Sequence, residues 1–125
     1  MGFPSPAQDF VESRVSLDGL CNTRAPSVYL FKADADSSQD GIKKGALLVV
    51  NSDCKPQDGS IIAATIGGAF RLVRYRTVPQ IHLQELNHPD RRLALTDDEV
   101  SGEEGICFGV ITHVLNDMRV KLDGM

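Results

Sequence analysis

The sequence predicts a mainly β domain of about seven strands with one short N-terminal helix. Short runs rich in β-branched and aromatic residues recur along the chain, and turn signals such as Asp58-Gly59 and Gly67-Gly68 separate them. No helical pattern of about 10 to 15 residues lies between these runs, which argues against a parallel α/β sheet. The chain has 125 residues, 42% of them hydrophobic, which predicts a single domain over residues 1–125 with a core of its own.

Residues 1–22 are expected to form a tail and a short helix. Ser5 is a suitable N-cap and Pro6 suits the first helical position. Leu17 and Leu20 are expected to lie on a second short turn.

Residues 27–115 are expected to form the β core. The Gly67-Gly68 pair fits the turn of a hairpin over residues 60–77. Residues 96–105 are acidic and predict an exposed connection, and residues 116–125 predict a polar tail. The expected strands are residues 27–33, 46–50, 60–66, 69–77, 81–85, 92–95 and 105–115.

The last predicted strand, residues 105–115, is the longest and is apolar on both faces. Strand alternation predicts that Ile106, Phe108, Val110, Thr112 and Val114 face one way and that Cys107, Ile111, His113 and Leu115 face the other. The strand is therefore expected to be buried on both sides, either as an ordinary central strand or with a partner subunit as one cover. On the second interpretation the dimer contact comprises Ile106, Phe108, Val110, Ile111, Thr112, His113 and Val114.

Composition excludes several classes of function. The formal net charge is −4 without a basic stripe, so direct nucleic-acid binding is not expected. No apolar run approaches 18 residues and no export leader is recognisable, so we expect a cytoplasmic protein. Cys21, Cys54 and Cys107 are widely spaced and the histidines are scattered, which predicts reduced, buried thiols, no metal site and no cofactor.

The stretch 32–50 organises the chain around a polar turn. Lys32 ends one predicted strand, and residues 46–50 begin the next. Ser37 lies between them, at the rim of the predicted sheet, where a nucleophile would be placed. From this pattern it is either an activated serine or a turn serine in contact with solvent.

Several short motifs occur in a specific order along the chain. They are Gly2-Phe3-Pro4-Ser5-Pro6-Ala7, Phe31-Lys32-Ala33, Asp36-Ser37, Asp40-Gly41, Leu47-Leu48-Val49-Val50, Ile61-Ile62-Ala63-Ala64 and Phe108-Gly109-Val110-Ile111-Thr112-His113-Val114. Each is weak alone, but in this order and spacing the chain resembles the UmuD/LexA family of self-cleaving serine–lysine proteins, most of all the shortened form UmuD′. The resemblance implies the β fold of the LexA/UmuD C-terminal domain.

In that family a serine attacks a peptide bond in the protein's own N-terminal arm, and a neutral, desolvated lysine takes its proton. By resemblance, Ser37 falls on the nucleophile position and Val73 on the lysine position, and valine has no nitrogen. Arg74 is expected on the opposite face of its strand, and a guanidinium cannot be deprotonated. The lysines closest to Ser37 in sequence are expected to be solvated and charged: Lys32, Lys43 and Lys44.

We therefore expect Ser37 to be a vestigial nucleophile and a solvated turn serine. The chain starts at Met1-Gly2, where cleavage in the family leaves a glycine, so the scissile arm is also expected to be missing. Both features are typical of a naturally short homologue from a bacteriophage or mobile element.

The resemblance implies an accessory subunit of an error-prone translesion DNA polymerase. Such a subunit forms a homodimer and binds a UmuC-type Y-family polymerase during SOS mutagenesis. Two alternatives stay open: a serine–lysine peptidase that acts in trans on UmuD/LexA-like proteins, and a decoy that forms mixed dimers with host UmuD or UmuD′.

Overall fold

The computed structural model describes residues 14–120, and these form a seven-stranded sheet in which every pairing is antiparallel. The predicted β class is confirmed. The strands are β1 (Val28–Lys32), β2 (Leu47–Asn51), β3 (Ile61–Ile66), β4 (Ala69–Arg76), β5 (His82–Glu85), β6 (Arg92–Ala94) and β7 (Cys107–Leu115). The helices are α2 (Leu17–Cys21) and α3 (Asp97–Ser101), with a 3-10 turn η1 (Ser38–Asp40). The helix expected to start at Ser5 lies outside the described residues.

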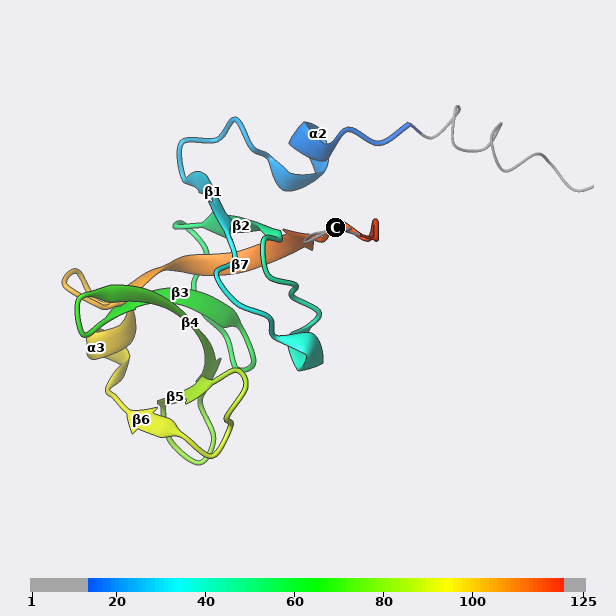
Figure 1. Ribbon diagram of the computed structural model, residues 1–125. Helices are drawn as coiled ribbons and strands as arrows, with labels where there is room; N and C mark the ends of the chain where they lie inside the picture. Colours follow the sequence, from blue (N-terminus) through cyan, green and yellow to red (C-terminus); the bar gives the residue numbers. More distant parts are fainter. Residues whose placement is uncertain (1–13, 121–125) are drawn as a thin grey trace, which may run out of the picture.

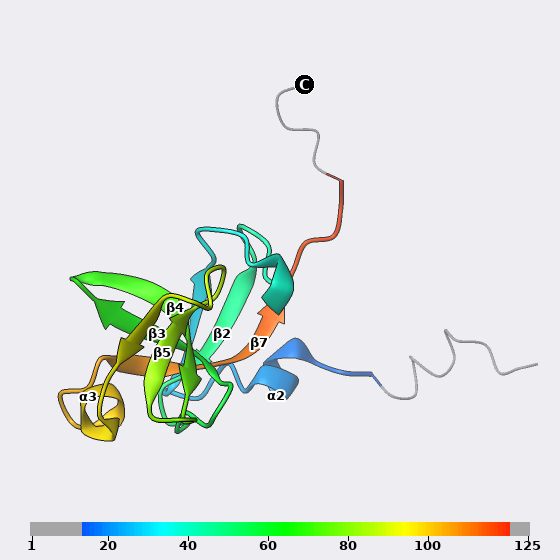
Figure 2. The same cartoon turned by 90° about the horizontal axis from the view of Figure 1, so that it is seen from below.

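The strand order is β1-β2-β7-β3-β4-β5-β6, so the last strand in sequence lies in the middle of the sheet. Figure 1 shows β3 to β6 curving away from the flatter layer of β1, β2 and β7, and Figure 2 shows the same curl from below. The predicted hairpin of β3 and β4 is present, and its Gly67-Gly68 turn uses positive φ angles of 61° and 81°. Within residues 14–120, no helix is long and apolar enough to cross a membrane.

The core consists of two clusters on opposite faces of the sheet. Strand β3 contributes to both, because Ala63 points to one face and its neighbours Ile62 and Ala64 point to the other. The first cluster comprises Ala33, Ile42, Ala46, Leu48, Val50 and Ala63. The second comprises Ile62, Ala64, Val73, Tyr75, Leu83 and Val100.

The predicted faces of β7 are wrong because the strand contains two irregularities. Val49 pairs with His113 but Val50 pairs with Ile111, so one extra residue of β7 lies between these pairs. A second shift occurs where β7 pairs with Ala63 and Ala64. Each bulge inverts the alternation beyond it. The inward side chains are therefore Phe108, Ile111 and Val114 toward the first cluster, and Ile106, Cys107 and Val110 toward the second.

Within the single chain β7 is not buried on both sides, so its interpretation as an ordinary central strand is wrong, while a partner subunit as one cover stays a prediction. Most of its side chains are half-buried, and Thr112, His113 and Leu115 are exposed. The C-terminal part of β7 therefore presents polar and apolar side chains to the surface.

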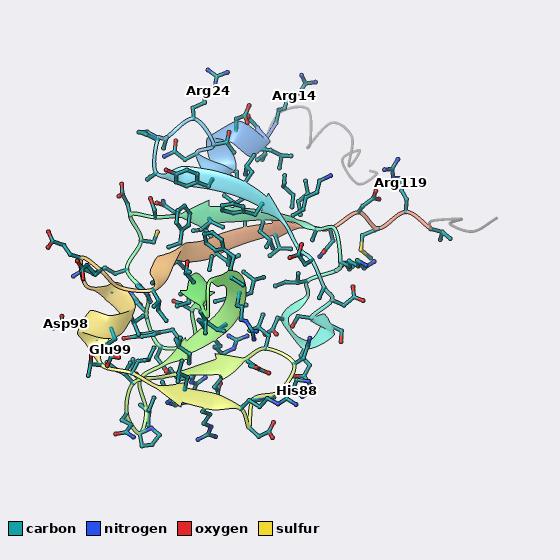
Figure 3. The ribbon with its side chains drawn as sticks, turned by 60° about the vertical axis from the view of Figure 1, so that its left-hand side comes forward. Arg14, Arg24, His88, Asp98, Glu99 and Arg119 are labelled. Atoms are coloured by element: carbon teal, nitrogen blue, oxygen red, sulfur yellow. The ribbon has the colours of Figure 1, made fainter. Side chains whose placement is uncertain are left out.

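The acidic segment 96–105 contains a helix that the sequence analysis did not predict. Thr96 caps α3 and forms a capping box with Glu99. Acidic side chains occupy the first turn, where they interact favourably with the helix dipole. Val100 is fully buried in the second core cluster, so the segment is anchored to the sheet. Figure 3 shows the Asp98 side chain of the same helix pointing away from the sheet.

The three cysteines are free thiols, but they are not all buried as expected. Cys54 is exposed because it lies in the turn after β2, and Cys21 and Cys107 are half-buried. Burial raises the pKa of the Cys107 thiol, and the Gly109 backbone offsets part of that effect.

Gly109 tests how closely β7 and β2 pack. A Cβ atom at this position would lie 2.8 Å from Val50 Cγ1 and 2.9 Å from the Asn51 carbonyl oxygen. We expect Gly109→Ala to lower the free energy of unfolding by about 2 kcal/mol in urea titration, through overpacking. The control is Gly19→Ala in α2, where the new Cβ would be 3.7 Å from Ser16 Cβ and stability should stay within about 1 kcal/mol. Equal midpoints for the two variants would contradict close packing at Gly109.

Candidate functional site

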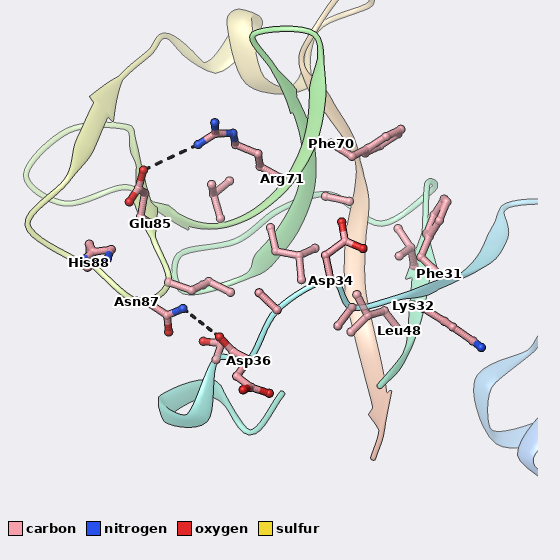
Figure 4. Close-up of a pocket in the computed structure, with 18 of the residues that line it drawn as sticks. Phe31, Lys32, Asp34, Asp36, Leu48, Phe70, Arg71, Glu85, Asn87 and His88 are labelled. Atoms are coloured by element: carbon pink, nitrogen blue, oxygen red, sulfur yellow. Dashed lines mark hydrogen bonds and ion pairs between the residues drawn. The ribbon is translucent and has the colours of Figure 1, made fainter. Parts of the chain in front are cut away.

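A cleft with a volume of about 620 Å³ lies between the loop after β1 and the curled strands β4 and β5. Figure 4 shows Asp34 and Asp36 on the loop, Arg71 on β4, and Glu85 at the end of β5. Residues of the first core cluster form the floor. The cleft is lined by residues 31–37 and 70–73, by Leu48, Val50 and Ala63, and by Glu85, Leu86, Asn87, His88 and Arg91.

The loop that carries Ser37 is folded back on itself by backbone hydrogen bonds. Ser37 and Ile42 form an isolated bridge, with N–H to carbonyl distances of 2.7 and 3.0 Å. Gly41 closes the turn between them with a φ of 72°, which favours glycine. Ile42 is 1% exposed and anchors the loop in the first core cluster.

The Ser37 hydroxyl is buried and hydrogen-bonded, so the expectation of a solvated turn serine is wrong. The residue is 4% exposed, and its Oγ donates to Asp40 Oδ2 at 2.5 Å. Asp40 in turn forms an ion pair with Arg74, whose other guanidinium nitrogen donates to the Gly59 carbonyl at 2.7 Å. This Ser37–Asp40–Arg74 chain joins the loop to strand β4.

The structure brings Val73 into the same cleft as Ser37. Val73 is 4% exposed and belongs to the second core cluster, where Ile62 is its cross-strand partner. A hydrocarbon therefore occupies the position that the family resemblance assigns to the lysine.

In the same cluster, the Tyr75 hydroxyl donates to Asp97 at 3.4 Å, and burial together with the Asp97 charge raises the Tyr75 pKa.

None of the described lysines near Ser37 in sequence places its amine in this core. The three lysines near Ser37 in sequence are exposed, as expected: Lys32, Lys43 and Lys44. Arg74 reaches the Ser37 loop only through Asp40, and its guanidinium remains protonated. The Ser37 hydroxyl thus donates its hydrogen bond to the Asp40 carboxylate.

The sequence analysis missed three residues that hold the loop. Asp40 is one, although its position three residues after a serine is a usual spacing for a local side-chain hydrogen bond. Asn87 donates to the Asp36 carbonyl at 2.9 Å. Asn116 donates to the Gly41 carbonyl at 2.7 Å and accepts from the Lys43 N–H at 3.0 Å. The asparagines lie 51 and 75 residues from their partners, so no local pattern indicates them.

The β7 residues predicted to make a dimer contact do not all lie at one surface. Thr112 and His113 are exposed and lie next to each other, with 2.9 Å between Thr112 Oγ1 and His113 Nδ1. The remaining candidates are half-buried members of the two core clusters: Ile106, Phe108, Val110, Ile111 and Val114.

The geometry defines a class of protein: an antiparallel β domain with a buried, hydrogen-bonded serine hydroxyl beside a cleft. Residues 14–120 contain no group of three His, Cys, Asp or Glu side chains arranged to hold a metal ion.

Comparison with known proteins agrees with this class. Residues 1–103 match the family described as Peptidase S24-like. The protein ImpA of Salmonella typhimurium is 36% identical over 120 residues, which are 94% of this chain and 79% of that protein. The protein MucA of Escherichia coli is 31% identical over 122 residues, covering 97% and 82%. The LexA repressor of Paracidovorax citrulli is 32% identical over 117 residues, covering 91% and 51%.

The chain belongs to the Peptidase S24-like family, a family of serine–lysine peptidases. The resemblance to the UmuD/LexA group is thereby confirmed, and so is the fold that it implied.

A double-mutant cycle tests the ion pair beneath Ser37. The Asp40 side chain is 7% exposed, so Arg74→Met leaves a nearly buried carboxylate without its cation. We expect a loss of about 1–3 kcal/mol in the free energy of unfolding. Asp40→Asn should lose a similar amount, and the double variant should lose less than the sum, which identifies direct coupling.

The control for this cycle is Arg119→Met, which removes an ion pair between Arg119 and Asp117 at the surface. Its effect should stay within about 0.5 kcal/mol. Strict additivity of the Arg74 and Asp40 substitutions in chemical denaturation would show that the pair does not hold the loop.

Proposed function

We propose that the chain is a UmuD′-like accessory subunit of an error-prone translesion DNA polymerase. In this proposal it acts in the cytoplasm during the SOS response and binds a UmuC-type Y-family polymerase. Family membership supports the class. One observation favours binding over catalysis: Val73, and not a lysine, lines the same cleft as Ser37.

Catalysis by Ser37 requires a base that accepts its proton as the oxygen attacks. In the family this base is a desolvated amine, and Val73 supplies only hydrocarbon. Asp40 holds the hydroxyl, but its carboxylate is engaged by the Arg74 guanidinium. We therefore propose that Ser37 is a vestigial nucleophile and that the protein works through its surfaces.

In the proposed assembly the protein is a homodimer that uses β7. The exposed pair Thr112 and His113 is the accessible part of this strand, and Leu115 extends it as an exposed apolar residue. A surface of this kind also fits mixed dimers with host UmuD or UmuD′, which is the decoy hypothesis. The two hypotheses share the interface and differ only in the partner.

A peptidase that acts in trans is the second candidate function. It is favoured by one observation: Ser37 is fixed at a cleft, with a carboxylate accepting its hydrogen bond. A peptidase of this kind would use the Ser37 hydroxyl on UmuD/LexA-like substrates.

Co-expression with a UmuC-type polymerase tests the favoured proposal. We expect the chain to elute with the polymerase in gel filtration, and to be dimeric alone. His113→Glu places a charge on the proposed dimer surface and should shift the free protein toward monomer, whereas Arg24→Glu, at an exposed position outside β7, should not. A folded dimer that fails to bind any such polymerase would exclude the accessory-subunit function.

A cleavage assay separates the two candidate functions. Wild-type protein and Ser37→Ala are incubated with an intact UmuD-like protein, and we expect neither to cut it. Val73→Lys should acquire slow cleavage, since it restores an amine that burial can keep neutral. This activity should disappear in the Val73→Lys, Ser37→Ala double variant. Cleavage by wild type that requires Ser37 would instead establish the trans peptidase.

A further inference from the structure

We propose that Asn116 couples the exposed end of β7 to the loop that carries Ser37, so that a second subunit bound at β7 holds this loop closed. The Ser37 loop comprises residues 33–46, between β1 and β2. The inference rests on the proposed homodimer and adds to it a conformational link between the dimer surface and the cleft. Closed means that the hydrogen bonds between the loop and Asn116 are made, and open means that they are exchanged for bonds to water.

The Asn116 side chain makes two hydrogen bonds to the loop. Its Nδ2 donates to the Gly41 carbonyl at 2.7 Å, and its Oδ1 accepts from the Lys43 N–H at 3.0 Å. A carboxamide carries both donors and an acceptor, so one side chain satisfies two backbone groups of opposite kind. Gly41 and Lys43 flank Ile42, which anchors the loop in the first core cluster. Asn116 therefore holds the loop at the point where it enters the core.

Strand alternation explains how one end of β7 reaches both the loop and the surface. Val114 packs on the first core cluster, and its neighbours His113 and Leu115 are exposed. One residue further on, alternation returns Asn116 to the face of Val114, and Ile42 of the loop packs in the same cluster. Leu115 thus points to the proposed dimer surface, and the next residue, Asn116, points to the loop.

The backbone at this end of β7 transmits a constraint from one surface to the other. Leu115 pairs with Leu47, the first residue of β2, and Figure 2 shows the turn η1 of the loop next to the end of β7. A subunit that packs on Leu115 restricts the motion of this strand end, so less conformational entropy is lost when the loop closes on Asn116. Dimer formation and loop closure therefore favour each other, and the coupling free energy is the same in both directions.

Other tethers of the loop come from elements outside β7. Arg74 on β4 forms the ion pair with Asp40, and Asn87 after β5 donates to the Asp36 carbonyl at 2.9 Å. These contacts do not involve the proposed dimer surface. Asn87 is a matched control for Asn116, because each asparagine donates a side-chain N–H to a carbonyl of the same loop.

Amide hydrogen exchange of the full, isotopically labelled chain tests the coupling. The probe is the Lys43 N–H, whose acceptor is Asn116. The reference is the Thr77 N–H, which donates to Asp58 Oδ1 at 2.9 Å and lies outside both the loop and β7. We expect Lys43 to exchange about five- to tenfold more slowly in the dimer than in the monomer obtained by dilution or by His113→Glu, with Thr77 unchanged.

The two ways in which this experiment can fail are distinguishable. Equal Lys43 exchange rates in a wild-type dimer and in the monomer would refute the coupling and leave the proposed dimer standing. A wild-type chain that stays monomeric at every concentration would refute the proposed dimer, and the coupling with it.

The variant Asn116→Ala removes the link itself. Because the coupling is reciprocal, the dissociation constant of its dimer in analytical ultracentrifugation should rise by the same factor, about five- to tenfold. Dimer formation should no longer slow exchange at Lys43. Asn87→Ala should leave the dissociation constant unchanged and retain the slower exchange. A Lys43 difference that persists in Asn116→Ala, or equal losses of dimer affinity in the two variants, would overturn the role of Asn116.

Discussion

The ion pair between Arg74 and Asp40 is the interaction on which the geometry of the cleft depends. The loop between β1 and β2 has no strand pairing to the rest of the sheet, and this pair ties it to β4 across 34 residues of sequence. A nearly buried carboxylate is stable only with a cation and hydrogen-bond donors beside it, and Arg74 and Ser37 supply both. The burial of Ser37 fits this arrangement, because its hydroxyl donates a hydrogen bond to the nearly buried Asp40 carboxylate.

Alternation along β4 explains how this framework coexists with a hydrophobic residue at position 73. Arg74 is directed to the loop and its neighbour Val73 to the second core cluster, so the two side chains serve different surroundings. A hydrophobic residue at position 73 joins a packed cluster with Ile62 and Leu83 without leaving a polar group unpaired. The polar chain beneath Ser37 therefore persists independently of what occupies the position assigned to the base.

Local sequence patterns were sufficient to predict the strands but not the contacts between them. The turn signals predict the β3–β4 hairpin, and the seven strands occur in the expected segments. The faces of β7 could not be derived, because its two bulges arise from pairing with β2 and β3. The capping box of Thr96 and Glu99 was present in the sequence, but the acidic composition around it favoured an exposed connection. The burial of Ser37 was not predicted, because Asp40, which accepts its hydrogen bond, is itself paired with Arg74, 34 residues away in the sequence.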